Sequence, residues 1–115
     1  MRVKLLVAII LYQFCLFVHA QGLIDVRHYS IEDGLSQNIV QDILQDDDGY
    51  IWLATWNGLE KYDGYTFKNY KSYPTDAIKL KYNRMVQVVK GSGHILWCHT
   101  YDDKVYPFDT RRERF

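Results

Sequence analysis

The distribution of apolar and polar residues divides the chain into two parts. Residues 5–18 are apolar except for Gln13, and the basic residues Arg2 and Lys4 precede them. After residue 20, apolar residues occur in short runs separated by turn-forming residues, and no stretch keeps a 3.6-residue apolar period long enough to predict a helix. The pattern therefore predicts an apolar N-terminal segment followed by an all-β region.

The N-terminal segment has the layout of a secretory signal peptide. A basic start precedes about 14 apolar residues, and Val18-His19-Ala20 supplies small or aliphatic residues at the two positions that a signal peptidase reads. An uncleaved membrane anchor is the alternative, although a membrane-spanning helix needs about 20 apolar residues. We expect residues 1–20 to be a signal peptide that is cleaved after Ala20.

The region after residue 20 contains two similar copies, 45 residues apart. The aligned positions include Asn38 and Asn83, Val40 and Met85, Trp52 and Trp97, Thr55 and Thr100, and, after one extra residue, Tyr62 and Phe108. A period of about 40–50 residues is typical of four-stranded β-propeller blades. We expect blade-like repeats at 38–70 and 83–115, a connection at 71–82, and a lead strand at 23–31.

Turn signals divide each copy into strands. In the first copy we expect strands at 39–45, 50–55, 59–62 and 65–70, and Asn57-Gly58 predicts a type I′ turn because both central positions of that turn need positive φ. In the second copy we expect strands at 83–90, 94–100 and 104–109, with a fourth beginning near Arg112. Trp52 and Trp97 occupy equivalent positions, so both are expected in the core.

Two copies are too few to close a propeller, which needs about 4–8 blades. The fold class expected is therefore all-β, with about two blades of an incomplete ring. In a propeller an N-terminal strand often completes the last blade, and the strand at 23–31 would have that place. We expect the chain to be the start of a longer protein, shortened by gene truncation or by a fragmentary gene model.

Three motifs follow one another in the first copy. Residues 29–38 read Y-S-I-E-D-G-L-S-Q-N, residues 46–55 read D-D-D-G-Y-I-W-L-A-T, and residues 57–64 read N-G-L-E-K-Y-D-G. Together they resemble the repeat of the two-component regulator propeller family, usually written D-x-x-G-x-I/L-W-x-G-T followed by N-G-L-x-x-Y-D-G. Ala54 stands where glycine is usual, and in the second copy Asp102-Asp103 stands where Asn-Gly would be.

The resemblance implies a periplasmic sensor. Members of this family usually place propellers in the periplasm, followed by an immunoglobulin-like domain, a membrane helix and a cytoplasmic histidine kinase, and they usually sense oligosaccharides. It follows that the partners of this chain would be the missing blades and downstream domains of its parent, an oligosaccharide ligand, and a second copy in a parent homodimer. The parent would be anchored in the inner membrane, and its kinase activity would lie in domains absent here, so this chain is not expected to be an enzyme.

Charge and cysteine content narrow the function further. The chain has 14 basic and 14 acidic residues, and loss of Arg2 and Lys4 leaves 12 against 14, a net charge of −2. No basic surface is expected for direct nucleic-acid binding. Cys98 would be the only cysteine left after cleavage, so no internal disulfide is expected.

No cofactor or metal is expected either. The run Asp46-Asp47-Asp48-Gly49 lacks the spacing of a calcium loop and reads as a solvated hairpin turn. His94 and Cys98 would lie about 13 Å apart along one strand, while the adjacent His99 would point to the opposite face. Cys98 is therefore expected to be a small buried residue.

Aromatic side chains are the candidates for ligand contact, because sugar rings pack their C–H faces on them. The four candidates are Trp56, Tyr62, Tyr65 and Tyr101. The function expected is ligand sensing within a two-component signal transduction system. The alternatives are a fragment of a carbohydrate-active propeller enzyme, or a nonfunctional remnant of a truncated gene.

Overall fold

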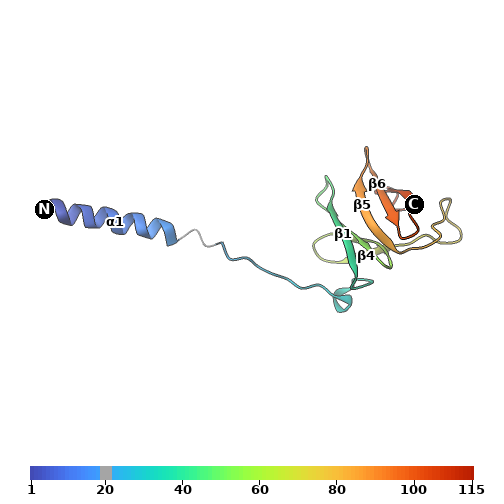
Figure 1. Cartoon of the computed structure of the whole chain (residues 1–115), viewed down its shortest axis with the longest axis horizontal. Coiled ribbons are helices and arrows are strands. Elements are labelled where there is room, and N and C mark those ends of the chain that lie inside the picture. Colours follow the sequence, from blue (N-terminus) through green and yellow to red (C-terminus); the bar gives the residue numbers. More distant parts are fainter. Residues whose placement is uncertain (19–21) are drawn as a thin grey trace.

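The computed structural model describes residues 1–18 and 22–115, whose strands form two antiparallel sheets (Figure 1). An N-terminal helix α1 (Arg2–Val18) and a short 3₁₀ helix η1 (Ile31–Asp33) precede them. The first sheet has the order β1 (Val40–Gln45), β2 (Ile51–Thr55), β3 (Gly58–Tyr62), β4 (Phe67–Tyr70), and the second has the order β5 (Met85–Lys90), β6 (Ile95–Thr100), β7 (Val105–Asp109). Both are meanders in which each strand pairs with the next along the chain, and the all-β class is confirmed.

The two sheets repeat each other in detail. Each first strand carries a bulge at the equivalent place, between Val40 and Asp42 in β1 and between Met85 and Gln87 in β5. Strands β1 and β5 lie next to each other, and the Val88 N–H donates to Asp42 Oδ2 at 3.0 Å. The 45-residue period therefore corresponds to two sheets of the same build, placed face to face as consecutive blades.

The core lies between the two sheets and is rich in aromatic rings. Trp52 and Phe108 are fully buried, and their ring centroids lie 5.4 Å apart in an edge-to-face arrangement. Tyr70 lies 5.1 Å from Phe108, and Leu59 and Met85 complete the contact. Burying two apolar sheet faces against each other is the main stabilising contribution expected for such a pair.

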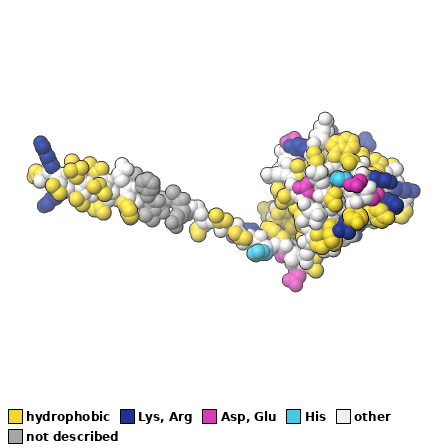
Figure 2. All heavy atoms as spheres, viewed as in Figure 1, with side chains coloured by type: hydrophobic (Ala, Val, Ile, Leu, Met, Phe, Trp, Pro, Cys, Tyr) yellow, Lys and Arg dark blue, Asp and Glu magenta, His cyan; other side chains and the backbone are white. Residues whose placement is uncertain are grey.

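The expectation that both equivalent tryptophans are in the core is half wrong. Trp52 is 0% exposed, whereas Trp97 is 43% exposed. Along β6 the residues that face the first sheet are buried, and Trp97 points the opposite way. Among the described residues no sheet covers that outer face, so the ring is partly in solvent. Apolar side chains are visible on the surface of the sheet region (Figure 2).

The predicted type I′ turn is also wrong. Thr55 pairs with Gly58, which leaves Trp56 and Asn57 as the two loop residues. Neither loop residue has a positive φ, whereas Gly58, which follows them, has a φ of 106°. This is the pattern of a type I turn followed by a G1 bulge. In the second copy Asp103 takes the place of Gly58 and has a φ of 58°.

The lead strand predicted at 23–31 is not formed. Residues 22–30 have no regular secondary structure, because an extended segment becomes a strand only when another strand supplies its partners, and none does so within the described part. The segment that follows η1 instead covers the outer face of the first sheet. Leu35 is 6% exposed there, and the Ser36 N–H donates to Oε1 of the buried Glu60 at 3.0 Å.

The ends of the chain differ from the predictions in two further respects. The fourth strand expected near Arg112 is absent, because residues 110–113 turn and Arg114 forms only an isolated bridge with Asp109. Of residues 1–18 and 22–115, no helix is long and apolar enough to cross a membrane. The cleavage site predicted after Ala20 lies outside the described residues, and the signal peptide stays a prediction.

Candidate ligand-binding site

Trp56 and Tyr101 occupy equivalent places, each immediately after the second strand of its sheet. The Trp56 N–H donates to the Ile39 carbonyl at 3.3 Å, and the Tyr101 N–H donates to the Arg84 carbonyl at 2.9 Å. Ile39 and Arg84 are the residues that enter β1 and β5. Each aromatic residue is therefore hydrogen-bonded to the residue that precedes the first strand of its own sheet. Both aromatic residues lie at the same end of the two sheets.

Arg84 brings these two aromatic residues together. Its guanidinium carbon lies 3.5 Å from the Trp56 ring centroid and 4.4 Å from the Tyr101 ring centroid. The rings come from different sheets, so the contact bridges the two blades. Trp56 is 37% exposed and Tyr101 is 61% exposed, which leaves aromatic surface available to a ligand. We call Trp56, Arg84 and Tyr101 the end cluster.

The other two candidates, Tyr62 and Tyr65, lie at the opposite end of the first sheet. Tyr62 is the last residue of β3, and its ring stacks on Phe67 with centroids 4.6 Å apart. Its hydroxyl bonds that of Tyr29 at 2.8 Å, which raises the pKa of Tyr62. Tyr65 is 91% exposed in the turn between β3 and β4. The structure thus brings together two of the four predicted residues, and separates them from the other two by the length of β3.

Asp46 has a positioning role that the sequence reasoning missed. The run 46–49 is the expected hairpin turn, and Asp46 Oδ1 accepts the N–H groups of Asp48 and Tyr50 at 3.0 and 2.9 Å. The other carboxylate oxygen, Oδ2, accepts the indole N–H of Trp52 at 2.7 Å. The sequence feature that could have predicted this role is the spacing of six residues between Asp46 and Trp52, on either side of a hairpin turn. In the second copy Gly91 stands at this position.

The residues considered for metal or nucleophilic chemistry are engaged structurally. Cys98 is 0% exposed, as expected, and burial raises the pKa of its thiol to about 12, so it carries little thiolate. His99 Nε2 lies 3.3 Å from Asp103 Oδ1. No group of three or more His, Cys, Asp or Glu side chains in the described ranges could hold a metal ion.

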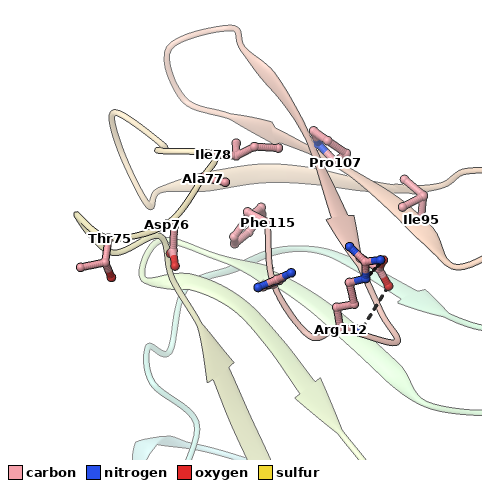
Figure 3. A pocket seen from close by; sticks show the side chains of 10 residues that line it. Thr75, Asp76, Ala77, Ile78, Ile95, Pro107, Arg112 and Phe115 are labelled. Atoms are coloured by element: carbon pink, nitrogen blue, oxygen red, sulfur yellow. Dashed lines mark hydrogen bonds and ion pairs between the residues drawn. The ribbon is translucent and has the colours of Figure 1, made fainter.

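A depression of about 430 Å³ is lined by ten residues, none of which belongs to the end cluster (Figure 3). Ile78, Pro107 and Phe115 lie around it, from the connection, β7 and the C-terminal residues. Ile95, which also lines it, and Pro107 belong to the face of the second sheet that carries Trp97. Phe115 belongs to the core and Ile78 packs against it, so the depression lies at the edge of the second sheet, between the connection and the C-terminal residues.

These observations define the class of protein. Two successive antiparallel sheets of the same build, related by a 45-residue period and packed face to face, are blades of a β-propeller. Residues 34–57 match the model of the family described as two component regulator propeller. The chain therefore carries a repeat of that family, and the resemblance seen in its motifs is confirmed.

Two known proteins are similar to this chain. The extracellular domain of a hybrid two component system from B. thetaiotaomicron matches with a TM-score of 0.67 and 29% identity, over 77% of this chain and 12% of that chain. Histidine kinase P4 from Formosa agariphila is 50% identical over 48 residues, which are 42% of this chain and 4% of that protein. The chain thus spans a small part of the length of either relative.

Proposed function

We propose that this chain is part of a periplasmic ligand-sensing propeller of a two-component histidine kinase regulator, and that its ligand is an oligosaccharide. The chain contributes binding surface and no chemistry of its own. Ligand binding acts through the geometry of the propeller, or of a parent dimer, on distant domains. The helix α1 belongs to the signal peptide that directs export.

The observation that carries this proposal is the end cluster. Two partly exposed aromatic residues from adjacent blades lie at one end of the sheets, bridged by a guanidinium group. Aromatic faces offer sugar rings a large contact area at low cost in conformational entropy. The repeat match, and the likeness to an extracellular domain of a hybrid two component system, support a regulatory rather than a catalytic role.

Binding of short neutral and acidic oligosaccharides to the purified full chain tests the proposal. Tryptophan fluorescence should change saturably with at least one of them, and Tyr101→Ala should weaken that binding about tenfold or more, the loss of roughly one aromatic contact. Tyr65→Ala is the matched control, because it removes an exposed tyrosine from the opposite end of the sheet.

Three results would contradict the proposal. The first is that no oligosaccharide binds. The second is that Tyr65→Ala weakens binding as much as Tyr101→Ala does, which would move the site away from the end cluster. The third is release of new reducing ends from the oligosaccharides, which would favour the carbohydrate-active enzyme.

A further inference from the structure

We propose that Arg84 binds an oxyanion, a carboxylate or a sulfate ester, carried by the sugar ligand. This inference rests on the proposed function and adds the chemical class of the ligand. The end cluster would then select acidic over neutral oligosaccharides, with the ring of an acidic sugar against Tyr101 and its charged group on the guanidinium.

The guanidinium of Arg84 has a donor without a hydrogen-bond partner. The Arg84 Nε atom is buried and has no hydrogen-bond partner among the residues that the structure describes. A buried donor without a partner costs about 1–3 kcal/mol, so the position needs a reason other than stability. A guanidinium that stacks on ring faces still has its two terminal Nη groups in its own plane, and these can form two hydrogen bonds to one carboxylate or sulfate.

Among the described residues, Arg84 forms no ion pair with a carboxylate. Five other basic side chains in the described ranges form ion pairs with carboxylates, namely those of Arg27, Lys61, Lys68, Lys90 and Arg112. Arg84 is not among them. Its charge is held in place by two aromatic rings instead, which position a cation without neutralising it.

The equivalent position of the first blade is not an arginine. Arg84 aligns with Ile39 in the first copy, and both residues accept the same backbone bond from the aromatic residue that follows the second strand. The blade therefore forms at this position with an aliphatic side chain, and the guanidinium is not required by the architecture. What Arg84 adds to the second blade is charge and directional donors.

Charges of both signs lie beside Tyr101. Asp102 and Asp103 follow it in the sequence, and Asp102 Oδ1 accepts the Thr100 hydroxyl at 2.6 Å within its own turn. That hydrogen bond and the positive charges of Lys104 and Lys81 lower the pKa of Asp102. The two lysines thus offset the negative charge of this turn, and the guanidinium of Arg84 adds a further positive charge at the end cluster.

The test compares three probes on the full chain: a galacturonate tetrasaccharide, a sulfated galactose tetrasaccharide and a neutral galactose tetrasaccharide. At least one acidic probe should bind about tenfold or more tightly than the neutral one, as expected for charge-assisted hydrogen bonds. Arg84→Gln should remove this preference, because it removes the charge-assisted hydrogen bonds that only an acidic probe can form. Which acidic probe binds distinguishes a carboxylate ligand from a sulfate ligand.

Two further variants keep the test decisive. Arg111→Gln removes the same charge from an exposed residue in the turn after β7 and should leave the preference unchanged. Arg84→Lys keeps the charge but loses the planar pair of donors, so it should reduce the ratio of acidic to neutral binding. It serves in place of Arg84→Gln if that variant fails to fold in circular dichroism.

The outcomes separate this inference from the proposed function. Equal binding of neutral and acidic probes, or a preference that survives in both Arg84 variants, would overturn the inference and leave oligosaccharide sensing intact. Absence of binding by all three tetrasaccharides would overturn the inference, and binding of other oligosaccharides in the wider panel would then show that the proposed function survives.

Discussion

Replacing Gly58 with alanine should destabilise the protein more than the same replacement at Gly64. Both glycines adopt positive φ, 106° and 98°, so an alanine meets similar backbone strain at either position, about 1–2 kcal/mol. The two sites differ in space. A Cβ at Gly58 would lie 2.5 Å from the Tyr70 carbonyl oxygen, whereas a Cβ at Gly64 would meet nothing within 4 Å.

The clash at Gly58 cannot be relieved by a side-chain rotation. The Tyr70 carbonyl is backbone at the end of β4, which pairs with β3, so β3 and β4 must separate to admit the methyl group. Inserting a methyl group where no space exists typically costs about 1–3 kcal/mol. The expected loss in unfolding free energy is therefore about 2–5 kcal/mol for Gly58→Ala and about 1–2 kcal/mol for Gly64→Ala.

Urea unfolding of the full chain, followed by far-UV circular dichroism, measures both losses. The two losses of unfolding free energy should differ, because both variants have the cost of a positive φ and only Gly58→Ala adds a steric clash. Losses that agree within about 0.5 kcal/mol, near the usual limit of additivity, would refute the steric argument.

Three further predictions use the same unfolding assay. Lys68 and Lys61 contact Glu113 and hold the pKa of its carboxyl at about 2, below the ordinary 4.5. These ion pairs therefore stabilise the fold above pH 4.5, and their contribution is lost as the pH falls toward 2. Glu113→Gln should cost about 1 kcal/mol of unfolding free energy at pH 7, and a loss that persists unchanged at pH 2 would contradict this prediction. Trp52→Ala should cost about 3–5 kcal/mol of unfolding free energy because the ring is fully buried. Trp97→Ala should cost clearly less because its ring is 43% exposed. Equal costs would contradict the assignment of Trp52 to the core and of Trp97 to the outer face of the second sheet. Asp103→Gly should raise the unfolding free energy by up to about 1 kcal/mol by relieving a φ of 58°, because the Asp103 side chain is 95% exposed and its contact with His99 contributes little. A fall in stability would contradict this prediction.

The sequence predicts strands well where each strand is defined by its neighbours along the chain. All strands of both meanders were expected within a few residues of their observed bounds, because turn residues such as Asp63-Gly64 act locally. The type I′ turn at Asn57-Gly58 was wrong because the registers of β2 and β3 decide which residues are central, and register depends on packing. The strand at 23–31 failed because it needed a distant partner.

The candidate site divides in the same way. Composition and position drew attention to Trp56, Tyr62, Tyr65 and Tyr101, but residues on one strand or hairpin can lie at either end of a sheet. Only the tertiary structure shows that Trp56 and Tyr101 share an end, and that Arg84 stands between their sheets. Arg84 gave no signal in the sequence, since a single arginine before a strand has no distinctive spacing.

The sequence by itself determined the repeat, the order of the strands and the resemblance to a regulator propeller, because these depend on local turn chemistry and on a period of 45 residues. The tertiary structure decided which of two equivalent tryptophans is buried. A repeat assigns the same face to both, but burial depends on the sheet that lies opposite, and the second sheet covers Trp52 while none of the described residues forms a sheet over Trp97. Burial and site geometry are properties of the neighbours of a residue in space, and a local pattern cannot specify them.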